Sequence, residues 1–197
     1  MKIDPYDHNI LIVGDSGSGK SNFVNWFAHS LPSNIPFWVW DYNHQHSYAR
    51  TVSNVSDLGY ERTVIQPRDL SEENFIRFAE RADRAGNLVV IIEEVQEYVT
   101  PHKLVAESFF RTARNRGTTW VALTQRPAEI SSALVSNAHH RIAFRLTHPN
   151  DVKFLCRWIS PKMEQVQSLP PYYWLYHTKL VAAEPVKCAP VAFTERI

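Results

Sequence analysis

Short runs of apolar residues alternate with segments of helical periodicity along most of this chain. Continuous apolar runs at residues 10–13, 36–40, 88–92 and 120–124 are typical of strands covered on both faces. Segments with apolar residues at helical spacing separate these runs, at residues 21–30, 71–86 and 103–115. This alternation predicts an α/β fold with a mostly parallel central sheet and helices on both faces.

Residues that favour helix ends support two of these helices. Ser71 is a good N-cap residue, and two glutamates follow it in the first turn, where the helix dipole favours negative charge. Gly86 can end the same helix, because glycine readily adopts the left-handed conformation found at helix C-termini. Gly117 is expected to end the helix at residues 103–115 in the same way.

The second half of the chain continues the alternation less regularly. We expect a helix from Pro127 to Val135, a strand at residues 141–145 and a helix at residues 151–159. In the first half, residues 63–65 predict one further short strand, whereas residues 44–57 are interpreted as polar and irregular.

The composition changes at Leu169. Two prolines precede the aromatic run Tyr172–Tyr176, and a tail rich in Val, Ala and Pro follows it. This pattern predicts a C-terminal edge hairpin or an extended arm. We therefore predict a single domain over residues 1–197, with a core at about 10–160 and a C-terminal extension at 169–197.

A glycine-rich segment with the phosphate-binding pattern G-x-x-x-x-G-K-S follows the first apolar run. Its setting between a predicted strand and a predicted helix is the one that this loop requires, because its amides and the helix N-terminus then face the phosphates. We expect ATP there, with the lysine reaching the β- and γ-phosphates and the serine hydroxyl binding Mg²⁺. The predicted nucleotide-binding residues are Gly14, Asp15, Ser16, Gly17, Ser18, Gly19, Lys20 and Ser21.

An acidic pair, Glu93 and Glu94, ends the most apolar of the predicted strands. Hydrolysis of a nucleoside triphosphate uses one acid to hold Mg²⁺ and another to polarise the attacking water. Adjacent residues at a strand end can divide these roles, because successive side chains point to opposite sides. We expect Glu93 to serve Mg²⁺ and Glu94 to serve the water; a solvated acidic turn is the alternative.

Polar or special residues end four of the predicted strands. These are Gly14, Asp41, Glu93 and Gln125. Because parallel sheets bind ligands at the carboxyl ends of their strands, we expect these residues to share one site. Gln125 can bond the γ-phosphate or the attacking water there; alternatively, its amide caps the following helix.

Three arginines, Arg111, Arg114 and Arg116, lie just before Gly117. In a ring of identical chains, an arginine from one chain can complete the neighbouring site and neutralise charge during phosphoryl transfer. Cationic residues also favour a helix C-terminus for electrostatic reasons alone. The functional interpretation of these residues is that one of them acts in trans, as an arginine finger in the site of the neighbouring chain.

Charge and cysteine content restrict the class of protein. A formal net charge of +1 over 197 residues means that any contact with nucleic acid must come from local patches. Cys156 and Cys188 lack metal-type spacing, and no apolar run is long enough to span a bilayer, so we expect a reducing compartment and no stable membrane insertion. The histidines at 44, 46, 139 and 140 are interpreted as surface or loop residues. The tryptophans at 38, 40 and 120 and the aromatic residues at 172–176 are interpreted as core.

The ordered set of motifs resembles the FtsK/HerA superfamily of DNA-translocating ATPases. The segments that carry the resemblance are Gly14–Ser21, Val89–Glu94 and Ala113–Pro127, and Thr-Gln-Arg-Pro at 124–127 is the most diagnostic. The resemblance extends from about Ile10 to Leu155. Two positions depart from the pattern: many members have Asp in place of Glu93, and cellular members often have His in place of Gln96.

This resemblance implies a RecA-like fold, ATP with Mg²⁺, and double-stranded DNA as the track of a homo-oligomeric ring, hexameric or pentameric. Residue by residue, it implies Lys20 and Ser21 as the P-loop pair, Glu93 and Glu94 as the acidic pair, Gln125 as sensor and Arg114 as trans arginine finger, with Arg116 and Arg111 as alternatives. A chain of this length that carries the motor alone is most similar to the genome-packaging ATPases of tailless icosahedral viruses with internal membranes. That similarity implies a capsid or portal-vertex partner, and a location in the host cytoplasm or at the packaging vertex of the virion.

Four other functions are weighed against viral DNA packaging. The first is a cellular or plasmid HerA-like motor in DNA processing or conjugation. The second is a small-molecule P-loop kinase, which the Thr-Gln-Arg-Pro segment at 124–127 disfavours. The third is a nucleotide-gated assembly factor with little turnover, which Lys20, Ser21 and Glu94 disfavour. A GTPase is disfavoured because the chain lacks the Asn-Lys-x-Asp signature.

Overall fold

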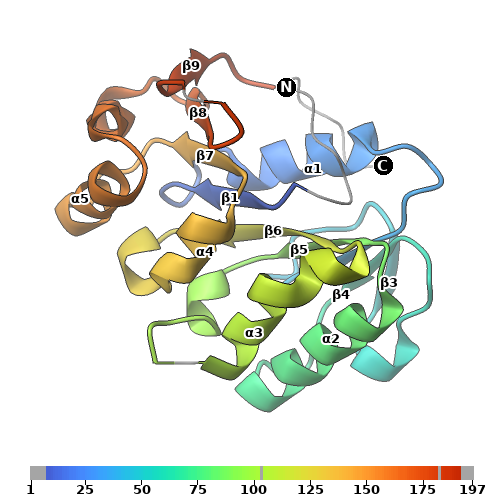
Figure 1. Cartoon of the computed structure of the whole chain (residues 1–197). Coiled ribbons are helices and arrows are strands. Elements are labelled where there is room, and N and C mark those ends of the chain that lie inside the picture. The colour runs from blue at the N-terminus through green and yellow to red at the C-terminus, as the bar shows by residue number, and fades with distance from the viewer. Residues whose placement is uncertain (1–7, 103, 182, 192–197) are drawn as a thin grey trace.

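Nine strands form one sheet in the part of the chain that the computed structural model describes, residues 8–102, 104–181 and 183–191 (Figure 1). Their order across the sheet is β3-β4-β2-β5-β6-β1-β7-β8-β9. The strands are β1 (Ile10–Val13), β2 (Phe37–Trp40), β3 (Arg50–Val52), β4 (Thr63–Ile65), β5 (Val89–Ile92), β6 (Thr119–Thr124), β7 (His140–Phe144), β8 (Trp174–Thr178) and β9 (Val186–Cys188).

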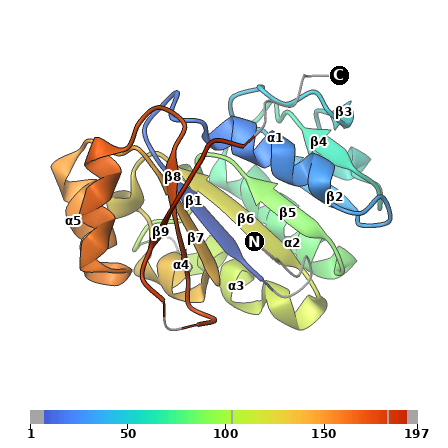
Figure 2. The same ribbon diagram turned by 90° about the horizontal axis from the view of Figure 1, so that it is seen from above.

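Strands β1 to β7 pair with one another in parallel, whereas β8 is antiparallel to β7 and β9 is antiparallel to β8. The predicted fold class, a mostly parallel α/β sheet, is therefore confirmed. The C-terminal edge hairpin is also present: β8 pairs with β7, and β9 pairs with β8 (Figure 2). Residues 192–197 of the predicted extension lie outside the described residues.

Helices cover both faces of the sheet, as predicted. Helix α1 lies on one face, and α2, α3 and α4 lie on the other (Figure 1). The helices are α1 (Lys20–Ser30), α2 (Glu72–Ala85), α3 (Leu104–Thr112), α4 (Ser132–Asn137) and α5 (Pro149–Trp158). Short 3-10 helices connect them: η1 (Val55–Asp57), η2 (Val95–Glu97), η3 (Ala113–Arg116), η4 (Pro127–Glu129) and η5 (Pro161–Ser168).

The two faces of β1 explain why the central strands are continuous apolar runs in the sequence. Ile10 and Ile12 belong to the core beneath α1, whereas Leu11 and Val13 belong to the core beneath α2 to α4. Successive strand residues point to opposite faces, so a strand with helices on both sides must be apolar at every position. Burying one such side chain contributes about 1.5–3 kcal/mol, which makes these runs the main source of fold stability.

Several predicted element boundaries were wrong. Strand β3 falls in the segment that was interpreted as irregular, because only Val52 of its three residues is buried and no apolar run marks it. The helix predicted from Pro127 to Val135 is divided into η4 and α4, with Ser131 as the N-cap of α4. The predicted start of α3 at Lys103 lies outside the described residues.

The four histidines were interpreted as surface or loop residues. His44, His46 and His139 do lie in loops, but His140 begins β7, and of the four only His44 is exposed. His46, His139 and His140 are 3%, 8% and 1% exposed. Each has a specific hydrogen-bond partner that makes burial tolerable: a glutamate for His46, the Asn9 amide for His139 and Tyr176 for His140.

The aromatic residues are divided between the core and the surface. The tryptophans of β2 and β6 are core residues, as expected, and Trp174 is also buried. Tyr172, which was expected in the core, is 55% exposed and has a left-handed backbone with φ of 65°. None of the helices in the described ranges has the length and apolar character that crossing a membrane requires.

Candidate functional site

The carboxyl ends of four neighbouring strands form one polar edge of the sheet. Gly14, Asp41, Glu93 and Gln125 directly follow β1, β2, β5 and β6, which are adjacent in the order β2-β5-β6-β1. The expected convergence of these strand ends is therefore present in the structure. A pocket of about 380 Å³ opens at this edge, and its lining residues are Ser16, Gly17, Gly19, Lys20, Ser21, Asn22, Asn43, Gln45, Glu93, Glu94, Leu123 and Gln125.

Two glycines of the P-loop occupy positions that no larger residue fits. A Cβ atom on Gly14 would lie 2.7 Å from both Phe144 Cβ and Ser18 Oγ. Gly19 has φ of +113°, and a Cβ there would lie 3.1 Å from Cδ1 of Tyr172. The glycine pattern therefore follows from close packing of the loop against β7 and against the C-terminal segment.

Lys20 is held within the P-loop by backbone carbonyl groups. Its Nζ atom donates to the carbonyl oxygens of Gly14 and Asp15, at 2.8 and 2.9 Å, and the residue is 8% exposed. Burial lowers the pKa of the ammonium group, and the nearby carboxylates of Glu94, Asp15 and Glu93 oppose that shift. An ammonium group has three donors, so the same atom can serve a phosphate oxygen at the loop.

Glu93 has one bonded and one unbonded carboxylate oxygen. Oε1 lies 2.7 Å from Nε2 of His46, and the glutamate is 3% exposed. Oε2 is buried and has no hydrogen-bond partner among the described residues. The Ser21 hydroxyl lines the same pocket and donates to Gln45 Oε1 at 3.3 Å. An unpartnered carboxylate oxygen and a hydroxyl in one pocket fit the oxygen ligands that Mg²⁺ prefers.

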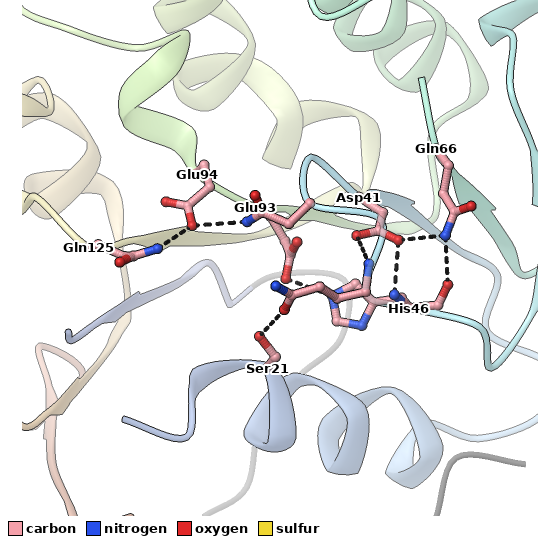
Figure 3. A network of polar contacts seen from close by, with 9 residues as sticks. Ser21, Asp41, His46, Gln66, Glu93, Glu94 and Gln125 are labelled. Atoms are coloured by element: carbon pink, nitrogen blue, oxygen red, sulfur yellow. Dashed lines mark hydrogen bonds and ion pairs between the residues drawn. The ribbon is translucent and has the colours of Figure 1, made fainter. Parts of the chain in front are cut away.

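A buried network behind Glu93 holds the loop that follows β2 (Figure 3). Asp41 is fully buried; its Oδ1 accepts from the amide of Gln45 at 2.8 Å, and its Oδ2 accepts from the amide of His46 at 2.9 Å. Gln66 donates to the same Oδ2 at 3.0 Å. Possible metal-ligand atoms of Asp41, His46 and Glu93 lie within 4.8 Å of one another. Because three donors already occupy the aspartate, we interpret the group as a support for Glu93.

Glu94 turns away from the direction of Glu93. Its backbone is left-handed, with φ and ψ both 48°, a conformation that costs a residue with a side chain on the order of 1 kcal/mol. Oε1 of Glu94 accepts from Asn43 Nδ2 at 3.1 Å and from Gln125 Nε2 at 2.5 Å, and Oε2 accepts from Gln96 Nε2 at 2.6 Å. Three amides from separate segments therefore orient this carboxylate.

Sequence reasoning missed several of these residues. Asn43, Gln45 and His46 lie in the loop that follows β2, most of which was interpreted as irregular from residue 44 onward, and Tyr172 was assigned to the core. An aspartate at a strand end was a signal for the loop after β2, because such a side chain often accepts from the amides that follow it. No comparable signal marked Tyr172.

The three candidate finger arginines lie far from the pocket of their own chain. Arg111 is on α3, and Arg114 and Arg116 are on η3, which leads into the start of β6. The six residues of β6 rise about 3.3 Å each, so about 20 Å separates this end of the strand from Gln125 at the other. All three arginines are exposed, and Arg116 Nε lies 3.9 Å from Asp83 Oδ2. Within one chain they do not approach Lys20.

Arg126, beside Gln125, is anchored to α5. Its Nε atom lies 3.3 Å from Asp151 Oδ2, and its Nη2 lies 2.9 Å from Glu129 Oε1. Asp151 is fully buried and also accepts from the amide of Ala128 at 2.9 Å. The Thr-Gln-Arg-Pro segment is thus fixed between Glu94 on one side and α5 on the other.

No protein-family model and no curated protein matches the chain. Comparison with solved structures does find proteins of similar fold. The genome packaging NTPase B204 from Sulfolobus turreted icosahedral virus 2 has a TM-score of 0.85 in complex with sulfate, at 21% identity over 96% of this chain and 98% of that chain. Its complex with AMPPCP has a TM-score of 0.82, at 20% identity over 96% and 100%.

More distant similarity extends to a conjugation protein and a secretion ATPase. The pCW3 conjugation coupling protein TcpA has a TM-score of 0.60, at 16% identity over 95% of this chain and 61% of that chain. The cytoplasmic domain of the Type VII secretion ATPase EccC from Thermomonospora curvata has a TM-score of 0.58, at 15% identity over 91% and 25%. The chain has the P-loop NTPase fold of the B204 structures, in agreement with the predicted fold class.

Proposed function

We propose that this chain is an ATP-hydrolysing motor that translocates double-stranded DNA and packages a viral genome into a preformed capsid. The observation that carries the proposal is the meeting of Lys20, Ser21, Glu93, Glu94 and Gln125 around one pocket. The fold of a viral genome packaging NTPase over almost the whole chain supports the same function.

Each residue of the pocket has a distinct role in the proposed hydrolysis. Lys20 binds the β- and γ-phosphate oxygens in place of its present carbonyl partners. Ser21 and Glu93 would hold Mg²⁺, which supplies positive charge to the phosphates when it is bound. Glu94 accepts a proton from the attacking water at its carboxylate, and Gln125 orients that water and bonds the γ-phosphate.

A homo-oligomeric ring, hexameric or pentameric, is part of the proposal because one cation is missing from the pocket of a single chain. Among the described residues, the pocket lining contains Lys20 as its cation. Charge that develops during phosphoryl transfer is commonly neutralised by a further arginine. Arg114, at the opposite end of β6 from its own pocket, is our candidate for the arginine that acts in another chain's pocket; Arg116 and Arg111 are the alternatives.

The proposed setting follows from the function. The track is double-stranded DNA, the further partner is a capsid or portal-vertex protein, and the motor acts in the host cytoplasm or at the packaging vertex. We propose no stable membrane insertion for it. A cellular or plasmid HerA-like motor would have the same pocket, and similarity to TcpA at fold level accords with that alternative.

The experiment that tests the proposal measures ATP hydrolysis with and without linear double-stranded DNA. We expect Mg²⁺-dependent hydrolysis that DNA stimulates several-fold, and no hydrolysis by Lys20→Ala, because that variant lacks the phosphate-binding cation. Hydrolysis that DNA leaves unchanged would contradict the motor, and full activity of Lys20→Ala would contradict the assignment of the pocket.

A further inference from the structure

A second hollow, of about 510 Å³, lies between the η1 segment and helix α2, and it shares no residue with the nucleotide pocket. We name it the arginine groove. It is bounded on one side by the loop at residues 53–56 and on the other by α2. Its lining residues are Ser53, Asn54, Val55, Ser56, Arg68, Asp69, Asn74, Arg77, Arg81 and Arg84.

Positive charge is concentrated in the arginine groove. Four arginines line it against a single acid, Asp69, although the whole chain has a formal net charge of +1. Arg77, Arg81 and Arg84 follow one another at helical spacing, so they lie on one side of α2. Arg68 adds a fourth guanidinium group from the segment between β4 and α2.

The protein uses little of the hydrogen-bonding capacity of these four side chains. Arg77 pairs with Glu73 at 2.6 Å, but both side chains are more than 60% exposed, at 66% and 75%, so the pair is weak. Arg81 donates to the carbonyl of Leu58. Arg68 and Arg84 make no hydrogen bond or ion pair with any described residue. Each guanidinium has five donors, and most of them are therefore available.

The acid in the groove is already engaged. Both oxygens of Asp69 accept from Ser71: Oδ1 from its amide and Oδ2 from its hydroxyl, each at 2.8 Å. These bonds hold Ser71, which is the N-cap residue of α2 and whose side chain accepts from the Asn74 backbone amide. Asp69 therefore has a structural role. Because four arginines line the groove with this one acid, an excess of positive charge remains there.

The spacing of the arginines suits a row of phosphates. Arg77 and Arg84 are seven residues apart, so at 1.5 Å per residue they are about 10 Å apart along α2. One DNA strand advances 3.4 Å per phosphate along the duplex axis, so the length of the row corresponds to about three such steps and can contact more than one phosphate. On the facing side, Ser53 adds a hydroxyl, a group that also bonds phosphate oxygens. Asn54 and Ser56 line the same side, but their side chains donate to Asp57 at 3.0 and 3.2 Å.

We infer that the arginine groove binds the phosphodiester backbone of nucleic acid, independently of base sequence. This inference rests on the proposed function, because the motor needs a contact with its track outside the ATP site. The groove offers guanidinium groups to phosphates. Helix α5, which provides the control substitutions below, lies at a distance from α2 across the fold (Figure 1).

The experiment compares the full chain with two charge-matched double variants. Arg68→Gln with Arg84→Gln removes two groove charges, and Lys153→Gln with Arg157→Gln removes two exposed charges from α5. Fluorescence anisotropy measures binding of a labelled 30-base-pair duplex over a range of salt concentrations. Binding of a fluorescent ATP analogue and the thermal unfolding midpoint are measured for all three proteins.

We expect the groove variant to bind the duplex about ten-fold more weakly and its salt slope to fall by about two, since each phosphate contact contributes about one to that slope. Its binding of nucleotide should equal that of the parent, and the α5 variant should bind DNA like the parent. Equal losses in both variants, or no loss in the groove variant while the parent binds DNA, would overturn the groove and leave the motor intact.

The same binding measurements also test which class of ligand the groove takes. A parent protein that binds no duplex at low salt would contradict both the groove and the proposed motor. Polyglutamate is the probe for an acidic protein partner, and we expect it to displace the duplex poorly at equal charge concentration. Equal displacement would overturn the assignment to nucleic acid.

Discussion

Gln125 donates a hydrogen bond to Glu94 at 2.5 Å, although 31 positions separate the two residues. The bond exists because β5 and β6 are parallel neighbours whose carboxyl ends meet at the same edge of the sheet. Both side chains line the pocket that also contains Lys20. The residues that we propose as the phosphate sensor and as the base for water are thus directly hydrogen-bonded to each other.

Replacing Glu94 by Gln should abolish turnover while leaving ATP binding close to that of the parent. The carboxylate now accepts from three amides, and a neutral amide in its place cannot accept a proton from water. We expect kcat to fall at least about 100-fold, the usual range for loss of a general base. Steady-state hydrolysis and binding of a fluorescent ATP analogue measure the two effects.

A matched control for that variant is Glu97→Gln. Glu97 lies on the same short helix, η2, but is exposed and does not line the pocket. It should keep nearly full activity. Normal turnover in Glu94→Gln would remove Glu94 from the catalytic role.

Arg114→Ala should stop hydrolysis in the assembled protein but leave ATP binding nearly intact. The residue lies at the far end of β6 from its own pocket, so any role in hydrolysis is exerted on another chain. Mixing the Arg114→Ala and Lys20→Ala proteins should restore part of the activity, because some interfaces then combine an intact pocket with an intact arginine. The ATPase rate of mixtures at several ratios measures this, and no rescue at any ratio would count against action in trans.

His46→Ala should raise the Mg²⁺ concentration needed for half-maximal hydrolysis. His46 bonds one oxygen of Glu93, and removing it leaves both carboxylate oxygens of a buried glutamate without that support. Loss of a residue that supports a metal ligand typically costs about 10–100-fold in metal affinity. Mg²⁺ titration of ATPase activity measures the shift, and binding of metal-free ATP should not change.

His44→Asn is the control for His46→Ala. His44 is exposed in the same loop and has φ of 54°, a conformation that asparagine tolerates. Its Mg²⁺ dependence should match that of the parent. Equal Mg²⁺ dependence in all three proteins would show that His46 does not support the metal site.

Folding stability should fall as the pH is lowered from about 6.5 to about 4. Burial, with repulsion from His8 and His139, lowers the pKa of His140 to about 4 in the folded protein. Over this range the unfolded chain binds the proton first, so the histidine contributes full stability above the unfolded pKa and loses it as pH falls. One such group contributes at most about 1.4 kcal/mol per pH unit.

Urea unfolding at pH 7 and pH 5 measures this effect, with His140→Phe as the comparison. The variant removes the titrating group but keeps an aromatic ring in the space, and its pH dependence should be shallower. Histidines other than His8 and His139, which interact with His140, add the same pH dependence to both proteins. An identical change in both proteins would exclude His140 as the source.

Local pattern determined the strand sequence of the core and the position of the P-loop. Continuous apolar runs identify strands that are buried on both faces, and the glycines of the loop precede a helix at a fixed offset. The rule that parallel strands present their carboxyl ends together brought Gly14, Asp41, Glu93 and Gln125 to one edge, and the structure places them there. The catalytic roles of these residues stay predictions.

Tertiary structure alone decided which residues support the acidic pair and which surfaces surround it. Asn43 and His46 reach glutamates 51 and 47 positions away, and Tyr172 covers Gly19 from a segment beyond β7. Glu94 has a left-handed backbone, and its carboxylate bonds a different set of residues from that of Glu93. Periodicity and motif spacing report on neighbours within a few turns of chain, whereas these contacts depend on strand order and on single backbone angles that only the packed sheet imposes.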